Sequence, residues 1–232
     1  MDRKLVNQVL FFKADAYLKE NPERFTDEEK IKFRKGLSEW FEGKSKTIDD
    51  EIFDFLAASG LFVDFKKRED AFMSYLNKKY ANLKFKKIFD VGAGRMCRLS
   101  RSLARLGCEM YAIDPKIRIN NREAARWNIK SIEKKLFLCD EFAAGGCGTN
   151  IENFDLLVGL EPCDATEHII RQCLKYDKHF EILLCAAAHD ALSGRKFKGY
   201  EDWYKYLKSI SSEVKIEKKD SSYYASNSQM ER

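Results

Sequence analysis

The sequence predicts an α/β protein built on a doubly wound, mostly parallel sheet, with a helical extension at its N-terminus. Three observations lead to this fold class. Apolar residues recur at helical spacing through residues 1–80, short apolar runs alternate with amphipathic segments from residue 84 onward, and a glycine-bearing turn closes the first of those runs. Strands and helices that alternate at this pitch are typical of βαβ units. We therefore predict a helical subdomain over 1–80 and an α/β domain over 81–232.

The first 80 residues carry the signals of amphipathic helices. Thr26 and Glu29 stand three positions apart, as in a capping box, and Phe33 and Leu37 follow at helical spacing. The same apolar spacing recurs further along this region. These stripes predict the core of a helical subdomain, with a groove that binds a partner as the alternative.

From residue 84 onward, five apolar runs have the length of buried strands. They are Lys87–Val91, Met110–Ile113, Leu136–Cys139, Phe154–Leu160 and Phe180–Ala187. The segments with helical periodicity are Cys97–Leu106, Ile117–Asn128, Thr166–Tyr176 and Glu201–Ile210. At the end of the chain, Glu213–Lys218 and Ser222–Ser226 predict an antiparallel pair at the sheet edge, and disorder of this Ser- and Lys-rich tail is the alternative.

Composition and charge exclude several classes of protein. Hydrophobic residues make up 44% of the 232 residues, but no run approaches the roughly 18 apolar residues of a membrane span. The N-terminus lacks the apolar core of a signal peptide, so we expect a cytoplasmic chain without a membrane partner. The seven cysteines form no C-x-x-C pair, and the three histidines all lie in the last third. We therefore predict neither a disulfide framework nor a metal site. The net charge of +5 lies entirely beyond residue 80 and permits an anionic partner such as nucleic acid.

The turn Asp90–Gly94 closes the first predicted strand. Its glycines let the backbone approach a ligand, and the helix that follows adds N–H donors. A dinucleotide-binding turn has a third glycine where this chain has Cys97, and Asp90 would repel a pyrophosphate. An acid at this place suits a cofactor that bears an ammonium and a sulfonium group. These residues favour an adenosyl cofactor and disfavour a nicotinamide oxidoreductase.

The order of the acidic residues resembles the successive cofactor motifs of class I S-adenosylmethionine-dependent methyltransferases, over roughly residues 84–220. The resemblance implies a sheet of about seven strands and S-adenosylmethionine as cofactor. It also implies one role for each residue: Asp90 lies near the methionine amino group, Gly92 and Gly94 pass under the cofactor, Asp114 holds the ribose, and Asp140 with Glu141 addresses the adenine. The family commonly has a third glycine where this chain has Met96.

The segment after the fourth predicted strand holds the catalytic candidates, because the end of that strand faces the transferable methyl group in this family. Glu161 is a candidate general base. Cys163 follows a proline, as in RNA cytosine-5 methyltransferases, and Cys185 could bring a second sulfur to the same pocket. Asp164 and Glu167 have the spacing of a helix cap and its N3 acid, which is a structural explanation for both.

Two sequence features bear on the acceptor. The segments "LEPCDATEH" and "LLCAAAHD" resemble a less-studied group of methyltransferases, some of which act on RNA, and they place His189 near the pocket. Basic residues interleave with aromatic ones around 195–204, a pattern that suits unstacked bases and phosphates. We predict methyl transfer to RNA ahead of a small-molecule or protein acceptor. The alternative is a non-catalytic module that binds an adenosyl compound or RNA.

Overall fold

The structure, a computed structural model, describes residues 3–20, 22, 25–42, 44, 52, 55–56, 63–80, 83, 86–140, 150–219 and 222–227. The chain divides into two compact units, Met1–Arg68 and Glu69–Arg232. Among the described residues, no helix combines the length and the apolar character that crossing a bilayer requires.

The first unit contains the helices α1 (Arg3–Glu20) and α2 (Asp27–Phe41). The predicted capping box is confirmed: the Thr26 amide donates to the Glu29 carboxylate over 2.8 Å, and the Glu29 amide donates to the Thr26 hydroxyl over 3.3 Å. The apolar stripes pack on one another within the unit, as predicted for a core. The buried members are Leu10, Ala14, Leu18, Phe25, Phe33, Leu37, Ile52, Phe55 and Leu56.

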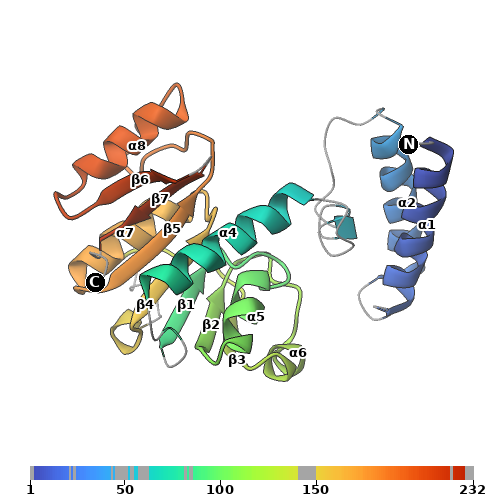
Figure 1. Cartoon of the computed structure of the whole chain (residues 1–232), viewed down its shortest axis with the longest axis horizontal. Helices are drawn as coiled ribbons and strands as arrows, with labels where there is room; N and C mark the ends of the chain where they lie inside the picture. Colours follow the sequence, from blue (N-terminus) through green and yellow to red (C-terminus); the bar gives the residue numbers. More distant parts are fainter. Residues whose placement is uncertain are drawn as a thin grey trace. The chain divides into compact units, whose positions relative to one another are not determined.

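The second unit is built on a seven-stranded sheet in the order β3-β2-β1-β4-β5-β7-β6 (Figure 1). Its strands are β1 (Lys87–Val91), β2 (Glu109–Ile113), β3 (Ile129–Glu133), β4 (Leu156–Leu160), β5 (His179–Leu184), β6 (Lys215–Lys219) and β7 (Ser222–Ser226). The first five are parallel, and β7 pairs antiparallel with both β5 and β6. The predicted fold class and the predicted antiparallel pair at the edge are confirmed.

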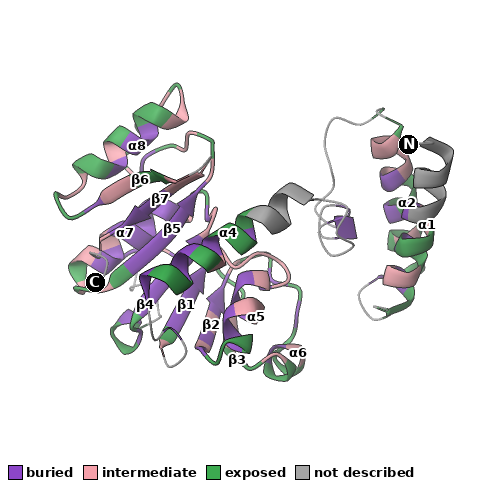
Figure 2. Ribbon diagram, viewed as in Figure 1, coloured by how far each residue is buried: buried purple, intermediate pink, exposed green. Residues whose placement is uncertain are grey.

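Helices cover both faces of this sheet, and its central strands are buried, whereas the edge strands β3 and β6 are mostly not (Figure 2). On one face pack the second half of α4 (Val63–Lys79), α5 (Arg98–Arg105) and α6 (Asn121–Arg126). On the other face pack α7 (Ala165–Lys175) and α8 (Tyr200–Ser209). A short 3-10 turn, η3 (Ile151–Asn153), precedes β4. The second unit thus has three layers, with the central strands buried on both faces.

The boundary between the units lies inside α4, earlier than the boundary predicted at residue 80. From Glu69 on, α4 belongs to the sheet unit because its apolar face, with Phe72 and Leu76, is fully buried in the core of that unit. A buried ion pair reinforces this packing: Lys79 Nζ lies 2.7 Å from the carboxylate of Glu181 on β5. Residues at helical spacing can pack on either neighbour, so periodicity alone did not place the boundary.

Two predicted elements differ from the structure. The third strand runs over Ile129–Glu133, and Leu136–Cys139 is irregular. β3 is an edge strand in which only Ile129 is fully buried, so it carries little apolar signal. Leu136–Cys139 shows the alternation of a strand because Phe137 and Cys139 are buried. The predicted helix over 117–128 is shortened to α6, which starts after a capping box at Asn120.

Candidate functional site

The candidate site lies where the strand order reverses, at the carboxyl ends of β1 and β4. The turn after β1 contains Gly92 and Gly94, whose φ angles of 72° and 67° favour glycine. A Cβ on Gly92 would lie 2.9 Å from Pro162, so this glycine is needed for contact with the turn after β4. A Cβ on Gly94 would meet nothing within 4 Å among the described residues. Gly94 therefore borders open space at the edge where parallel sheets bind their ligands.

Asp90, the next-to-last residue of β1, is buried, and only one of its two carboxylate oxygens has hydrogen-bond partners among the described residues. Its Oδ2 accepts hydrogen bonds from the Ser100 amide at 3.1 Å and the Ser100 hydroxyl at 2.6 Å. These bonds cap α5, whose N-cap residue Cys97 makes no side-chain cap. The other carboxylate oxygen, Oδ1, is buried and has no hydrogen-bond partner among the described residues. Burial raises the pKa of Asp90 to about 7, against the lowering effect of the Ser100 bonds. An unpaired buried acceptor of this kind suits a cationic donor from a ligand.

Asp114 follows β2 directly and lies beside the same turn. Its Oδ2 accepts from the Gly94 amide at 3.1 Å, and its Oδ1 accepts from the Lys116 amide at 2.7 Å. The negative charge of Asp114 also contributes to raising the pKa of Asp90. The structure therefore brings Asp90, Gly92, Gly94 and Asp114 together at one edge. The contribution of Ser100 was not predicted, because a serine in the first turn of a helix has no distinctive signal.

Asp140 does not join this group. Its carboxylate accepts hydrogen bonds from Lys175 at 2.7 Å, from Tyr176 at 2.7 Å and from Gln172 at 3.0 Å, all at the end of α7. These bonds hold the pKa of Asp140 below its usual range. Because β5 begins only a few residues after α7 ends, Asp140 lies near the amino ends of the strands, opposite the glycine turn. The placement at the adenine depended on a third strand at 136–139, which is not formed. Glu141 lies outside the described residues.

The turn between β4 and α7 has a strained backbone. Glu161 and Cys163 flank Pro162 with φ angles of 53° and 51°, a conformation that non-glycine residues rarely adopt. The Glu161 amide donates to the Leu183 carbonyl of β5 at 2.8 Å, which fixes the start of the turn. Strain of about 1–3 kcal/mol per residue persists only where the surroundings enforce it, and it is concentrated at functional sites.

Cys163 of this turn forms a cluster with a second thiol and an imidazole from the loop after β5. Cys163, Cys185 and His189 each offer one ligand atom, and these atoms lie within 4.8 Å of one another. His189 Nε2 is 2.8 Å from Cys185 Sγ, and His189 Nδ1 is 3.0 Å from Asp164 Oδ1. Hydrogen bonds from Cys163 and His189 lower the pKa of Cys185 to about 5, whereas the pKa of Cys163 is raised. The sequence favours Cys163 as the reactive cysteine, and the structure adds Cys185, with His189 as its partner, to the same cluster.

The spacing of Asp164 and Glu167 correctly predicts their positions, at the N-cap and in the first turn of α7, but not their hydrogen bonds. Asp164 makes no side-chain cap to α7, and its carboxylate holds His189 instead. Glu167 is buried and accepts from Arg171 at 2.8 Å and from the Leu192 amide at 3.0 Å. The spacing of a capping box is present, but both side chains bind the loop after β5: Asp164 contacts His189, and Glu167 accepts from the Leu192 amide.

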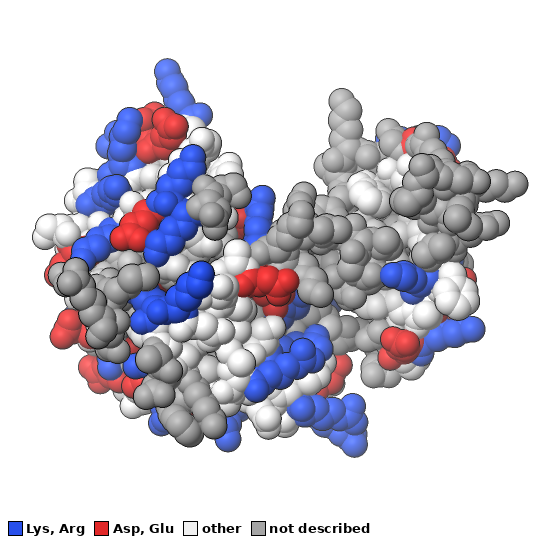
Figure 3. Space-filling model, in the orientation of Figure 1, with Lys and Arg blue, Asp and Glu red and all other residues white. Residues whose placement is uncertain are grey.

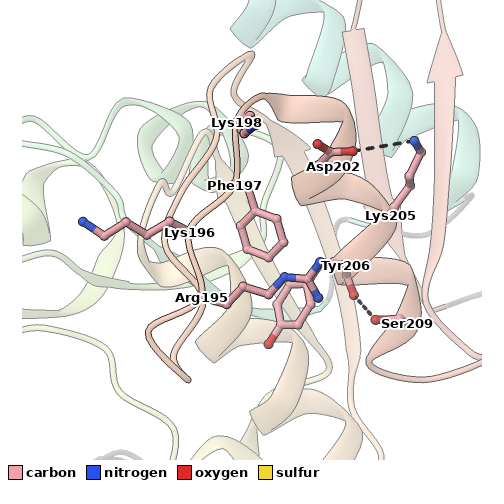
Figure 4. Close-up of a pocket in the computed structure, with 8 residues that line it drawn as sticks. All are labelled: Arg195, Lys196, Phe197, Lys198, Asp202, Lys205, Tyr206 and Ser209. Carbon is pink, nitrogen blue, oxygen red and sulfur yellow. Dashed lines mark hydrogen bonds and ion pairs between the residues drawn. The ribbon is translucent and has the colours of Figure 1, made fainter.

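A basic and aromatic pocket of about 430 Å³ lies between this loop and α8 (Figure 4). It is lined by Arg195, Lys196, Phe197, Lys198, Asp202, Lys205, Tyr206 and Ser209. The Arg195 guanidinium lies 5.0 Å from the centre of the Phe197 ring. Basic side chains spread over α8 and β6, with a few acidic ones between them (Figure 3). Trp203 and Tyr204, which the sequence groups with this surface, are buried in the core.

No family model and no curated protein sequence matches the chain. Among solved structures, the chain is similar to the 1,6-didemethyltoxoflavin-N1-methyltransferase of Burkholderia thailandensis with bound S-adenosylhomocysteine, at 14% identity over 76% of this chain and 84% of that one, with a TM-score of 0.40. It is also similar to the magnesium protoporphyrin IX methyltransferase of Synechocystis, at 11% identity over 70% and 82%, with a TM-score of 0.42. A third match is the fibrillarin/Nop5p complex, at 15% identity over 61% and 71%, with a TM-score of 0.41.

Several of the similar structures are methyltransferases. The seven-stranded, mostly parallel sheet of this chain is of the kind that the motif resemblance implies.

Proposed function

We propose that this chain is a methyltransferase that takes S-adenosylmethionine at the carboxyl ends of β1 and β2. The observation that carries the proposal is the buried, unpartnered Oδ1 of Asp90 next to a glycine that borders open space. The ammonium group of the cofactor would give Oδ1 its missing donor, and Gly94 leaves room for the cofactor backbone. Asp114 keeps lone pairs for the ribose hydroxyls beyond the two backbone bonds that it already accepts.

The cofactor supplies a methyl group on a positively charged sulfur, and the protein has to align a nucleophile with it. Glu161 stands at the end of β4, where the hydrogen bond from its N–H to the Leu183 carbonyl fixes the turn. We propose that Glu161 orients the acceptor and removes the proton from the acceptor's nucleophilic group. We assign Cys163 to the same site, because its thiol donates to the Glu161 carbonyl at 3.3 Å within the strained turn.

RNA is the proposed acceptor. The pocket beside α8 combines Arg195, Lys196 and Lys198 with the rings of Phe197 and Tyr206, and such a surface holds phosphates and stacks unpaired bases. It connects to the thiol and imidazole cluster through aromatic contacts, since Trp203 lies 6.1 Å from the ring of His189 and 5.4 Å from that of Phe197. A nucleotide in the pocket would thus lie along the same loop that carries His189.

The proposal is tested by incubating the protein with cofactor labelled in the methyl group and with cell extract, which is then separated into RNA, protein and metabolites. We expect label in RNA. The Asp114→Ala variant should lose both cofactor binding and labelling while keeping its fold. Binding of the cofactor without label in any fraction would support the alternative, a non-catalytic module. Unchanged cofactor affinity in Asp114→Ala would refute the placement of the ribose.

A further inference from the structure

A set of metal ligands stands at the carboxyl ends of β4 and β5. One ligand atom each from Cys163, Cys185 and His189 lies within 4.8 Å of the other two. Around a tetrahedral zinc ion, with bonds of about 2.0–2.3 Å, neighbouring ligand atoms are separated by roughly 3.5–3.8 Å. The three atoms are therefore close enough to share one ion after small side-chain rotations. Two of the residues come from the loop after β5 and the third from the turn after β4.

The surroundings of the histidine match those of a metal ligand. Its Nε2 points at Cys185 Sγ, 2.8 Å away, and its Nδ1 contacts Asp164 Oδ1 at 3.0 Å. Metal-bound histidines commonly donate their second ring N–H to a carboxylate, which fixes the tautomer and the ring orientation. Trp203 packs against the same ring at a centroid distance of 6.1 Å. His189 is thus held with the nitrogen that would bind a metal facing the sulfurs.

The cysteines are also held in position by the fold. Cys163 sits in the left-handed conformation, and its thiol contacts the carbonyl of Glu161 at 3.3 Å. The loop of Cys185 is tied to α8 by the hydroxyl of Tyr204, which donates to the Cys185 carbonyl at 2.8 Å. Sequence spacing hides this set, because its members come from two separate connections and include no C-x-x-C pair.

We propose that Cys163, Cys185 and His189 bind a zinc ion and leave its fourth position open. Thiolate and imidazole ligands select zinc over magnesium or calcium, and two cysteines with one histidine and an open position form a known type of catalytic zinc site. Binding displaces two protons, one from the Cys163 thiol and one shared between Cys185 and His189, so the ion and the two thiolates balance in charge. The open position faces solvent at the exposed Cys163 and can take water or an acceptor atom. This inference does not depend on the proposed methyl transfer.

The test uses the full chain with reduced cysteines. We expect about one zinc ion per chain after purification without chelators. When cobalt is titrated into chelator-treated protein, we expect the charge-transfer absorption of thiolate–cobalt bonds together with the visible bands of tetrahedral cobalt. Cys163→Ser and Cys185→Ser should each remove roughly half of the charge-transfer intensity and weaken binding by about 100-fold or more. Cys163 is exposed, so its variant is expected to fold.

Two further variants separate a ligand from a positioning residue. Asp164→Asn should weaken metal binding by about 10–100-fold but give the full spectrum at saturation, because it orients His189 without touching the ion. The matched control is Cys139→Ser. Cys139 also contacts a histidine, with its Sγ 3.3 Å from His168 Nδ1. Its replacement by serine should leave metal binding unchanged. The proposal is overturned if saturating cobalt gives no thiolate absorption, if the serine variants keep the full spectrum, or if Cys163 and Cys185 form a disulfide in protein kept under reductant.

Discussion

Replacing Asp90 by asparagine should stabilise the ligand-free protein at high pH. The pKa of Asp90 is about 7, against an ordinary value of 3.8. The unfolded chain ionises this carboxyl near pH 4, while the folded chain keeps it protonated until about pH 7. The stability it contributes is therefore complete below pH 4, falls as the pH rises from about 4 to 7, and is lost above that. The loss amounts to about 4 kcal/mol.

Asparagine has no charge to bury, so the variant avoids this loss. Its carbonyl oxygen can still accept from the Ser100 amide and hydroxyl, the two bonds that cap α5. Its NH₂ group occupies the place of the unpartnered Oδ1 and costs about 1–3 kcal/mol if it finds no acceptor. The net gain above pH 8 is about 1–3 kcal/mol. At pH 5 the wild-type carboxyl is neutral, and the variant should be equal or slightly less stable.

Binding of S-adenosylmethionine should change in the opposite direction. A hydrogen bond to a charged group contributes about 1.5–3 kcal/mol, so the variant should bind roughly 10–150-fold more weakly at pH 8. Urea unfolding at pH 5 and pH 8 measures the stability, and calorimetric titration measures the affinity. A variant that merely folded poorly would lose both. The reasoning about Asp90 is refuted if the variant is less stable than the wild type at pH 8, or if it binds the cofactor as tightly.

The remaining predictions concern other residues of the sheet edge and the pocket. Gly94→Ala should cost about 1 kcal/mol of stability, because its φ of 67° strains a side chain, and should abolish cofactor binding by filling the open space. Gly92→Ala should cost about 3 kcal/mol or more, since its Cβ would also meet Pro162 at 2.9 Å, and urea unfolding distinguishes the two. Asp140→Ala should lower stability by about 1–2 kcal/mol and leave cofactor affinity unchanged. Weaker cofactor binding by this variant would support the predicted contact of Asp140 with the adenine. Arg195→Ala should reduce the slope of log K for RNA against log salt by about 0.7–0.9 in filter binding, and an unchanged slope would exclude a phosphate contact there.

The central strands could be predicted from the sequence because they are buried on both faces. β4 is a continuous apolar run, β1 and β5 are apolar apart from one buried acid and the first residue of each, and the glycines after β1 mark the turn. β3 could not be recognised because it lies at the sheet edge and is mostly polar. The assignment of Asp140 to the adenine assumed that a strand ends at 139, and the structure has no strand there. The position of one weak edge strand thus decided which residue was assigned to the adenine.

The candidate site was predictable where the order of motifs along the chain marks it. Asp90 lies near the end of β1, and Gly94 and Asp114 follow β1 and β2, which pair directly, so these residues lie side by side. The contact of Asp164 with His189 joins the turn after β4 to the loop after β5, 25 residues further on. Neither segment carries a sequence signal that predicts its contact with the other. Asp164 instead had the spacing of a helix cap, and a local explanation concealed the long-range one.

Pro162 connects the glycine turn to the thiol and imidazole cluster. Two glycines make room for its ring, since a Cβ on Gly159 would lie 2.7 Å from it and a Cβ on Gly92 would lie 2.9 Å from it. The residues on both sides of the proline, Glu161 and Cys163, have left-handed backbone conformations. The turn after β1 therefore contacts directly the segment that carries Cys163. Through this contact the proposed cofactor site and the proposed zinc site are neighbours at the carboxyl ends of β1 and β4.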